Sequence, residues 1–379
     1  MFSYQKNQRF FAQVAAGLED AGCHELEELG AGEVKPSFRG IYFSADHETL
    51  YRLNYTSRLC TRFLAPLITF DCHSDKYLYK TAFALPWEEI LSLRTTFAIF
   101  ANVSNSNIRH SQYASRKLKD AIVDRFRELT GSRPDVDPDE PDVWISLHIQ
   151  GNRASIGLDT SGGSLHRRGY RKESVKAPMQ ETVAAAIIGF SQWDGSVPLY
   201  DPFCGSGTLL AEALLRKCLV PAGYLRERFG FEHLPDFDPG LWQKVRLACN
   251  AQIQPLPAGL INGSDISSQA VSAAKKNCGS LPGGQNIRIR TSRFQDLPEI
   301  RDSLIVCNPP YGIRLESARD AGNLLAELGR FLKEKCSGST AYIYLGKEDL
   351  LERIPLWPSW KKPLNNGGLP GILARYRIR

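Results

Sequence analysis

Between residues 176 and 345 short apolar segments alternate with longer helix-like segments, and this alternation limits the folds open to the chain. The expected order is helix 180–190, strand 197–201, helix 208–217, strand 259–263, helix 267–277, strand 286–290, strand 303–307, helix 320–335 and strand 340–345. Strands that alternate with helices favour a doubly wound, mainly parallel sheet, so this half is predicted to be α/β. Because 379 residues exceed the usual size of one hydrophobic core, a further domain is expected before it.

The residues before position 160 follow a different pattern. They indicate a strand at 10–14, a helix at 17–29, a strand pair at 34–43, a helix at 48–65, a strand at 97–103, a helix at 111–129 and strands at 143–150 and 153–159. Strand, helix and paired strands within about 35 residues are typical of a small α+β sandwich. Residues 160–175 are glycine-rich and basic, and we interpret them as a linker.

A glycine loop closes the first strand of the α/β half. Gly205 and Gly207 let the backbone approach a ligand closely, and Asp201 ends the strand, where its carboxylate can meet a polar or cationic group. The third glycine of the dinucleotide-binding fingerprint is absent from its expected place. The loop therefore predicts a nucleotide-like cofactor without specifying a dinucleotide.

Two further acids follow later strands of the same half. Asp265 ends the second strand, where an acid commonly binds ribose hydroxyls, and Asp296 follows the third, where it could meet an adenine amino group. Asp265 comes 64 residues after Asp201 instead of about 20, so an insertion at about 218–256 is expected.

The run Asn308-Pro309-Pro310-Tyr311 follows another apolar strand. The Asn308 amide oxygen and the Pro309 carbonyl can accept the two hydrogens of a planar amine, so that its lone pair points at a methyl donor. Pro310 stiffens the turn, and Tyr311 offers a ring on which a base can stack. This run predicts methyl transfer to an amine, with positioning as the main source of rate.

Several classes of protein are disfavoured by composition. No apolar run approaches the ~18 residues of a membrane helix, and the polar N-terminal segment lacks the apolar core of a signal peptide, so a cytoplasmic enzyme is expected. The nine cysteines are scattered without a Cys-x-x-Cys pair, which argues against a metal site. We expect buried thiols, including Cys204 and Cys307 in the two loops, to act as small hydrophobic groups.

The net charge of +6 is modest, but basic residues gather in three stretches without acids. Three such stretches in one enzyme favour a polyanionic partner. They contain Arg109, His110, Arg116, Lys117 and Lys119; His166, Arg167, Arg168, Arg171 and Lys172; and Lys361, Lys362, Arg375, Arg377 and Arg379.

These motifs resemble those of class I S-adenosylmethionine-dependent methyltransferases, and the whole chain resembles the THUMP-containing guanine-N2 RNA methyltransferases of bacteria that act on 23S rRNA. The resemblance rests on the two loops and on the segments 108–124, 165–171 and 177–186. It implies a Rossmann-like methyltransferase sheet behind an N-terminal α+β RNA-binding region. The implied domains are a ferredoxin-like region at 1–50, a THUMP-like RNA-binding domain at 51–160 and a methyltransferase domain at 161–379.

The resemblance also implies a role for individual residues. S-adenosylmethionine is the expected cofactor, and RNA (23S rRNA or the assembling large ribosomal subunit) is the expected partner, with no metal and no membrane. The expected cofactor-binding residues are Pro178, Glu181, Thr182, Asp201, Phe203, Cys204, Gly205, Gly207, Thr208, Asp265, Ile266, Asp296 and Asn308. The target base is expected at Asn308, Pro309, Pro310 and Tyr311, and RNA contacts at Arg109, Arg116, Lys117, Lys119, Arg167, Arg168 and Arg171.

Other activities stay open at this point. The loop at 308–311 cannot choose the amine by itself, so a tRNA guanine-N2 methyltransferase and an adenine-N6 methyltransferase of nucleic acid are alternatives. A protein glutamine methyltransferase shares the loop chemistry but leaves the basic stretches unexplained. A non-catalytic RNA-binding protein would not need two intact loops.

Overall fold

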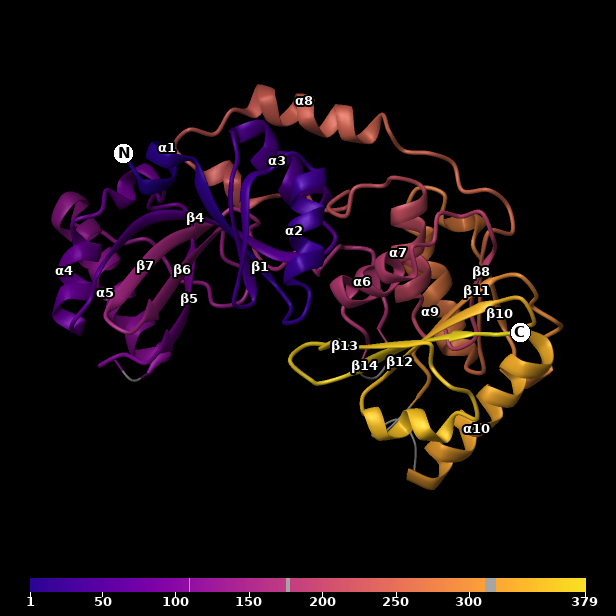
Figure 1. Cartoon of the computed structure of the whole chain (residues 1–379). Coiled ribbons are helices and arrows are strands. Elements are labelled where there is room, and N and C mark those ends of the chain that lie inside the picture. The colour runs from indigo at the N-terminus through magenta and orange to yellow at the C-terminus, as the bar shows by residue number, and fades with distance from the viewer. Residues whose placement is uncertain (109, 175–177, 311–317) are drawn as a thin grey trace.

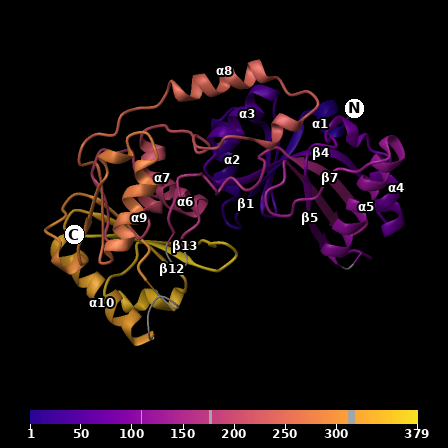
Figure 2. The same ribbon diagram turned by 180° about the vertical axis from the view of Figure 1, so that it is seen from behind.

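The computed structural model of the chain describes residues 1–108, 110–174, 178–310 and 318–379. It has an N-terminal and a C-terminal lobe, each built on its own sheet. Figures 1 and 2 show the two lobes side by side, with helix α8 (Pro239–Asn250) running along the top from one lobe toward the other.

The N-terminal lobe contains a seven-stranded sheet in the order β2-β3-β1-β4-β7-β6-β5. Neighbouring strands are antiparallel except for β5 and β6, which are parallel. The strands are β1 (Arg9–Val14), β2 (Gly32–Ser37), β3 (Gly40–Ser44), β4 (Cys60–Asp71), β5 (Phe97–Ser104), β6 (Val143–Gln150) and β7 (Arg153–Asp159). The helices are α1 (Ser3–Asn7), α2 (Glu19–Glu28), α3 (His47–Thr56), α4 (Asp75–Phe83) and α5 (Ser111–Thr130).

The central strand β4 joins the two N-terminal regions into one sheet. It pairs with β1 on one side and with β7 on the other, so the sheet continues past residue 50, where the sequence analysis places a domain boundary. The expected helix at 48–65 is wrong in its second half, because α3 ends at Thr56 and β4 begins at Cys60. Phe63, Ala65 and Leu67 are buried at every second position, which is the period of a strand.

The C-terminal lobe contains the second sheet, in the order β10-β9-β8-β11-β12-β14-β13. The first five strands are parallel to one another, β14 is antiparallel to its neighbours β12 and β13, and the sheet confirms the predicted mainly parallel, Rossmann-like fold. The strands are β8 (Leu199–Asp201), β9 (Ile261–Asp265), β10 (Arg288–Thr291), β11 (Leu304–Cys307), β12 (Thr340–Leu345), β13 (Trp360–Pro363) and β14 (Ile372–Arg377). The helices are α6 (Glu181–Ser191), α7 (Thr208–Lys217), α8 (Pro239–Asn250), α9 (Ser268–Gly279) and α10 (Ala318–Lys335).

The strand order places a ligand crevice between β8 and β11. The chain runs from β8 outward to β9 and β10, and then returns to the other side of β8 with β11. Ligands of open parallel sheets bind beyond the carboxyl ends of the strands at such a reversal. The antiparallel pair β13 and β14 was not predicted from the sequence, and β9 begins two residues later than expected.

The expected insertion at 218–256 packs on the N-terminal lobe. Its helix α8 lies against α3, and the ring of Trp242 makes edge-to-face contacts with Tyr51 and Tyr55 at centroid distances of 6.3 and 5.3 Å. The expected linker at 160–175 is also packed rather than free, since Ser161, Arg168 and Tyr170 in its described part are at most 2% exposed. Both segments therefore fasten the lobes together.

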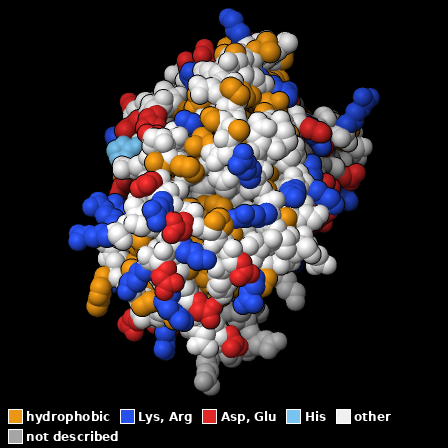
Figure 3. All heavy atoms as spheres, turned by 90° about the vertical axis from the view of Figure 1, so that its right-hand side faces the viewer, with side chains coloured by type: hydrophobic (Ala, Val, Ile, Leu, Met, Phe, Trp, Pro, Cys, Tyr) orange, Lys and Arg blue, Asp and Glu red, His pale blue; other side chains and the backbone are white. Residues whose placement is uncertain are grey.

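All nine cysteines are buried as free thiols, whereas the sequence predicted this for most of them. Burial raises the pKa of the Cys204 and Cys307 thiols well above the ordinary value, so neither is poised as a nucleophile. None of the helices in the described ranges is long and apolar enough to cross a membrane. Figure 3 shows a face of the C-terminal lobe on which acidic and basic side chains are interspersed.

Candidate active site

Three polar residues mark the carboxyl ends of neighbouring parallel strands. Asp201 is the last residue of β8, Asp265 is the last residue of β9, and Asn308 directly follows β11. Parallel pairing of β8 with both β9 and β11 brings these ends to one edge of the sheet. The structure therefore gathers the predicted glycine loop, the predicted ribose acid and the predicted amine-binding loop at the reversal point.

Backbone hydrogen bonds join the glycine loop to the end of β9. The Gly205 N–H donates to Asp265 Oδ2 at 3.0 Å, and the Cys204 N–H donates to the Ser264 carbonyl at 2.9 Å. Asp265 Oδ1 accepts the Ser267 N–H at 2.9 Å, just before α9. The Asp265 carboxylate is thus held in place, with lone pairs left over for a further donor such as a ribose hydroxyl.

The position of Gly207 strongly favours glycine. Its φ of +85° lies in the left-handed region, and a Cβ there would come within 3.0 Å of Cys278 Sγ and 3.2 Å of Ala274 Cα. Gly207 is the residue before α7, so its backbone sets the direction of that helix.

Asp201 is a buried carboxyl group at the centre of the edge. It is 1% exposed, and its Oδ1 accepts the Phe203 N–H at 2.9 Å. Burial raises its pKa well above the ordinary value, and the nearby Asp265 raises it further. A cationic ligand beside this carboxyl group would favour its ionised form, so the site suits a ligand with positive charge.

A second buried carboxyl group lies at the start of α6. Arg171 Nη2 is 3.1 Å from Glu181 Oε1 and donates to the Met179 carbonyl at 2.7 Å and to Thr208 Oγ1 at 3.2 Å. Burial raises the pKa of Glu181 to about 7 although Arg171 opposes the shift. The side chains thereby tie the start of α6 to the first residue of α7.

Asn308 carries the clearest sign of a missing partner. Its Oδ1 is buried and accepts no hydrogen bond within the described residues. Buried polar atoms are normally paired, so an unpaired acceptor at this edge fits a ligand N–H. Thr182 Oγ1 and Ser264 Oγ are also buried with no hydrogen-bond partner in the part of the chain that the structure describes. Pro309 is buried and Pro310 half-buried, whereas Tyr311 lies outside the described residues.

The remaining predicted cofactor residues differ in exposure. Ile266 is 69% exposed directly after Asp265, and Asp296 is exposed at the end of the short helix Phe294–Asp296. The Phe203 ring packs on Phe294 at a centroid distance of 5.1 Å. Pro178 is half-buried before α6. An exposed isoleucine beside Asp265 leaves an apolar surface open to a ligand.

One residue that supports the glycine loop was not predicted from the sequence. Asn277 of α9 is 1% exposed, and its Nδ2 donates to the carbonyls of Ser206 and Glu173 at 3.0 and 2.8 Å. Its Oδ1 accepts the Lys172 and Glu173 N–H groups. Asparagine on a helix gives no signal for contacts with residues 71 and 104 positions away.

The predicted RNA-binding residues differ in exposure and in pairing. Arg116 and Arg167 are exposed, whereas Lys117 and Lys119 are half-buried with Asp75 and Asp120 beside them at 4.0 and 2.9 Å. Arg109 lies outside the described residues.

The prediction that Arg168 contacts RNA is wrong. Its side chain is 1% exposed, and its guanidinium donates to the carbonyls of Ser57, Arg58 and Leu165 beside Glu212. Arg171 pairs with Glu181 and its side chain is 18% exposed, so its expected contact with RNA stays a prediction. A guanidinium group that is removed from water needs such partners inside the protein, and Arg168 and Arg171 both have them.

No cluster of three or more possible metal ligands occurs in the part of the chain that the structure describes. Polar acceptors, glycine-formed backbone and two buried carboxyl groups instead suit an organic ligand that is cationic and carries hydroxyl and amino groups.

Comparison with known proteins covers both lobes. Residues 168–375 match the RMKL-like methyltransferase domain, residues 72–159 the THUMP domain and residues 9–64 the RlmL ferredoxin-like domain. A protein of Synechocystis sp., named provisionally as an RNA methyltransferase, is 38% identical over 97% of this chain and 96% of its own length.

A second relative is longer than this chain. The ribosomal RNA large subunit methyltransferase K/L of Aliivibrio salmonicida is 37% identical over 98% of this chain, which spans about half (54%) of its length. Among solved structures, SMU.472, provisionally called a methyltransferase and complexed with SAH, superposes with a TM-score of 0.86 at 27% identity and covers 98% of both chains.

Proposed function

Because the chain belongs to the RMKL-like methyltransferase family, we propose that it transfers a methyl group from S-adenosylmethionine to the N2 amine of a guanine in ribosomal RNA. The family, its fold and its methyl donor are those that the sequence predicted. The RNA substrate is supported by the names of the relatives and by the THUMP match. Such an enzyme acts in the cytoplasm.

The residues at the edge of the sheet suit S-adenosylmethionine. Bound there, it supplies an activated methyl group on a sulfonium centre. Asp201 and Glu181 would offer carboxyl groups to the positively charged end, and Asp265 would accept the ribose hydroxyls. Ile266 would cover the adenine, with Asp296 close to its amino group.

The unpaired Asn308 Oδ1 is the observation that carries the choice of an amine as acceptor. We assign to this oxygen one hydrogen of the target amine and to the Pro309 carbonyl the other. An amine held by two acceptors presents its lone pair in the perpendicular direction, which is the alignment that methyl transfer needs. Fixed alignment of this kind can contribute ~7–11 kcal/mol to lowering the barrier.

The choices of guanine N2 as the target atom and of ribosomal RNA as the substrate are the most specific parts of the proposal. Guanine rests on the resemblance of the chain, because an amine-holding loop also accepts adenine N6. Ribosomal RNA rests on the K/L relatives, of which this chain covers about half. Transfer RNA is the alternative substrate of the same chemistry.

One experiment separates these possibilities. Purified protein is incubated with labelled S-adenosylmethionine and with 23S rRNA, tRNA or adenine-rich RNA, and the methylated nucleosides are identified by mass spectrometry. N2-methylguanosine in 23S rRNA alone is the expected product. N6-methyladenosine as the product would mean that the target is adenine. Label in tRNA only would mean that the substrate is transfer RNA.

The role of Asn308 is tested in the same assay. Asn308→Ala should lower the turnover by about 10²–10³-fold, the usual loss when one positioned hydrogen-bonding group is removed. Cofactor affinity measured by calorimetry should stay within about threefold of the wild type. Asn308→Asp, which keeps an acceptor oxygen, should retain more activity. Equal turnover for the alanine variant and the wild type would exclude the positioning mechanism.

A further inference from the structure

One end of the N-terminal sheet has a face that its helices leave open. Helices α1 and α2 pack on the face that carries Phe10, Val14 and Ile41, as shown by the Tyr4–Phe10 ring contact and by the closeness of Gly22 to Ile41 and Val14. Because side chains alternate along a strand, the neighbouring residues of β1, β2 and β3 point to the opposite face. We call this the Tyr42 face; it consists of Arg9, Phe11, Lys35 and Tyr42 on the strands, and we include Phe38 and Arg39 of the exposed turn between β2 and β3.

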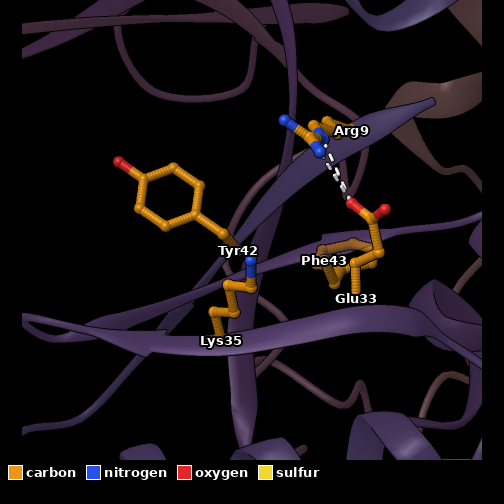
Figure 4. A pocket seen from close by; sticks show the side chains of 5 residues that line it. All are labelled: Arg9, Glu33, Lys35, Tyr42 and Phe43. Atoms are coloured by element: carbon orange, nitrogen blue, oxygen red, sulfur yellow. Dashed lines mark hydrogen bonds and ion pairs between the residues drawn. The ribbon is translucent and has the colours of Figure 1, made fainter. Parts of the chain in front are cut away.

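A shallow hollow of about 210 Å³ lies on this face, and Figure 4 shows Arg9, Glu33, Lys35 and Tyr42 around it. Small-molecule sites usually enclose roughly 300 Å³ or more. The hollow therefore suits one flat group laid on an open surface better than an enclosed metabolite. It is separate from the edge of the C-terminal sheet that carries Asn308.

Two aromatic rings on this face, those of Tyr42 and Phe38, are exposed, and the Tyr42 ring is held by Phe11. Tyr42 is 57% exposed, and its ring meets Phe11 edge to face at a centroid distance of 4.9 Å. The Phe11 ring lies over Gly40, where a Cβ would come within 2.0 Å of it. Phe38, in the turn between β2 and β3, is 87% exposed. A fixed, exposed ring is a stacking surface that is ordered before it binds.

The charge around these rings is positive. Arg9 bonds to Glu33, with Nη2 and Oε2 2.8 Å apart, which neutralises that acid and orients the guanidinium. Lys35 and Arg39 are exposed, and neither makes an ion pair among the described residues. Exposed rings with unpaired cations beside them match the bases and phosphates of an unpaired nucleic acid strand.

The Tyr42 face is connected to the C-terminal lobe. Glu19 accepts the Arg39 N–H at 3.2 Å and the Gly17 N–H at 2.7 Å. A Cβ on Gly17 would be 3.6 Å from the Pro363 carbonyl of β13. The loop after β13 reaches the start of α6, where Asn366 Oδ1 accepts the Gln180 N–H at 2.9 Å. Figures 1 and 2 both show the loop between β13 and β14 pointing toward the N-terminal lobe.

We propose that the Tyr42 face binds an unpaired segment of the RNA substrate, with a base stacked on Tyr42 and the flanking phosphates at Lys35 and Arg39. The proposal rests on the proposed function, because it locates part of the same RNA. The contacts through Glu19 and β13 would keep such RNA beside the lobe that methylates it.

The test uses the full chain, a fluorescein-labelled single-stranded RNA of twelve mixed nucleotides and the matching duplex. Tyr42→Ala should weaken binding of the single strand about tenfold, within the range of one base–aromatic stack, without changing its salt dependence. Tyr42→Phe should bind like the wild type. Lys35→Gln with Arg39→Gln should make the salt dependence shallower. Trp357→Ala, which removes a 95% exposed ring elsewhere, is the control.

The outcomes distinguish this proposal from the proposed function. Wild-type protein that neither binds nor methylates RNA would overturn both. Wild-type protein that methylates RNA, with Tyr42→Ala binding the single strand equally well, would overturn only the Tyr42 face. Equal losses for single strand and duplex would overturn base stacking. Circular dichroism checks the fold of each variant, and the exposed position of Tyr42 makes unfolding unexpected.

Discussion

Asp201 and Asn308 are 107 residues apart in the chain and lie at the ends of adjacent strands. Both were identified from the sequence, because a polar residue that ends an apolar strand in an alternating α/β pattern must reach the carboxyl edge. Whether these residues bind the cofactor and the amine remains a prediction. What no local pattern indicated is the burial of Asp201 and the unpaired oxygen of Asn308.

Gly207 provides a residue-level test of the glycine loop. Gly207→Ala should weaken S-adenosylmethionine binding by tenfold or more in calorimetry, because its φ of +85° and its contact with Cys278 leave no room for a methyl group. Gly279→Ala is the matched control, since a Cβ at Gly279 meets nothing within 4 Å. Equal cofactor affinity in both variants would contradict the role of the loop.

Glu181 provides a test of the buried carboxyl group. Its pKa is raised from 4.5 to about 7, so the folded protein holds a proton that the unfolded chain releases between these values. Stability should therefore fall as the pH rises from 5 to 8, by about 3 kcal/mol at most from this group.

Glu181→Gln should remove this dependence in urea unfolding at several pH values. His166, whose pKa is lowered to about 4, acts in the opposite direction and is present in both proteins. The difference between the two proteins thus reports Glu181. Parallel curves for wild type and variant would contradict the raised pKa.

At the scale of elements, the insertion after α7 has a structural role that its sequence did not reveal. The rings of Phe229, Phe231 and Trp242 pack together and against Tyr51 and Tyr55 of α3. Their spacing in the insertion has no simple period, because α8 and the turn before it meet a helix about 190 residues earlier in the chain. Long-range packing of this kind is invisible to local periodicity.

Trp242→Ala should lower the free energy of unfolding by about 3 kcal/mol, the usual cost of removing a large aromatic ring from a packed cluster. Leu247→Ala on the same helix, where the side chain is 63% exposed, should change it by less than about 0.5 kcal/mol. Chemical denaturation with fluorescence detection measures both. A loss as small for Trp242 as for Leu247 would mean that the insertion does not fasten the lobes.

At the scale of the whole molecule, the basic residues divide into exposed and internal groups. Arg116→Glu and Arg167→Glu should each weaken RNA binding and lower the slope of log affinity against log salt by about one. Arg168→Met should instead destabilise the fold, since it leaves Glu212 buried without its cation, at a cost of roughly 3–5 kcal/mol. Fluorescence titrations at several salt concentrations, combined with thermal unfolding, separate the two behaviours. If Arg168→Met changed the slope of log affinity against log salt, Arg168 would again be assigned to RNA binding.

The sequence by itself determined the alternation of strands and helices, the loops that end β8 and β11, and the family to which the chain belongs. These features depend on neighbours in the chain: apolar periodicity, glycine where the backbone turns, and a motif whose chemistry is local. The tertiary structure alone decided that β4 joins the N-terminal regions, that Arg168 is internal, and that Tyr42 stands exposed beside unpaired cations. Exposure and ion pairing result from contacts between distant residues, so the same arginine in a basic stretch can bind RNA or hold two lobes together.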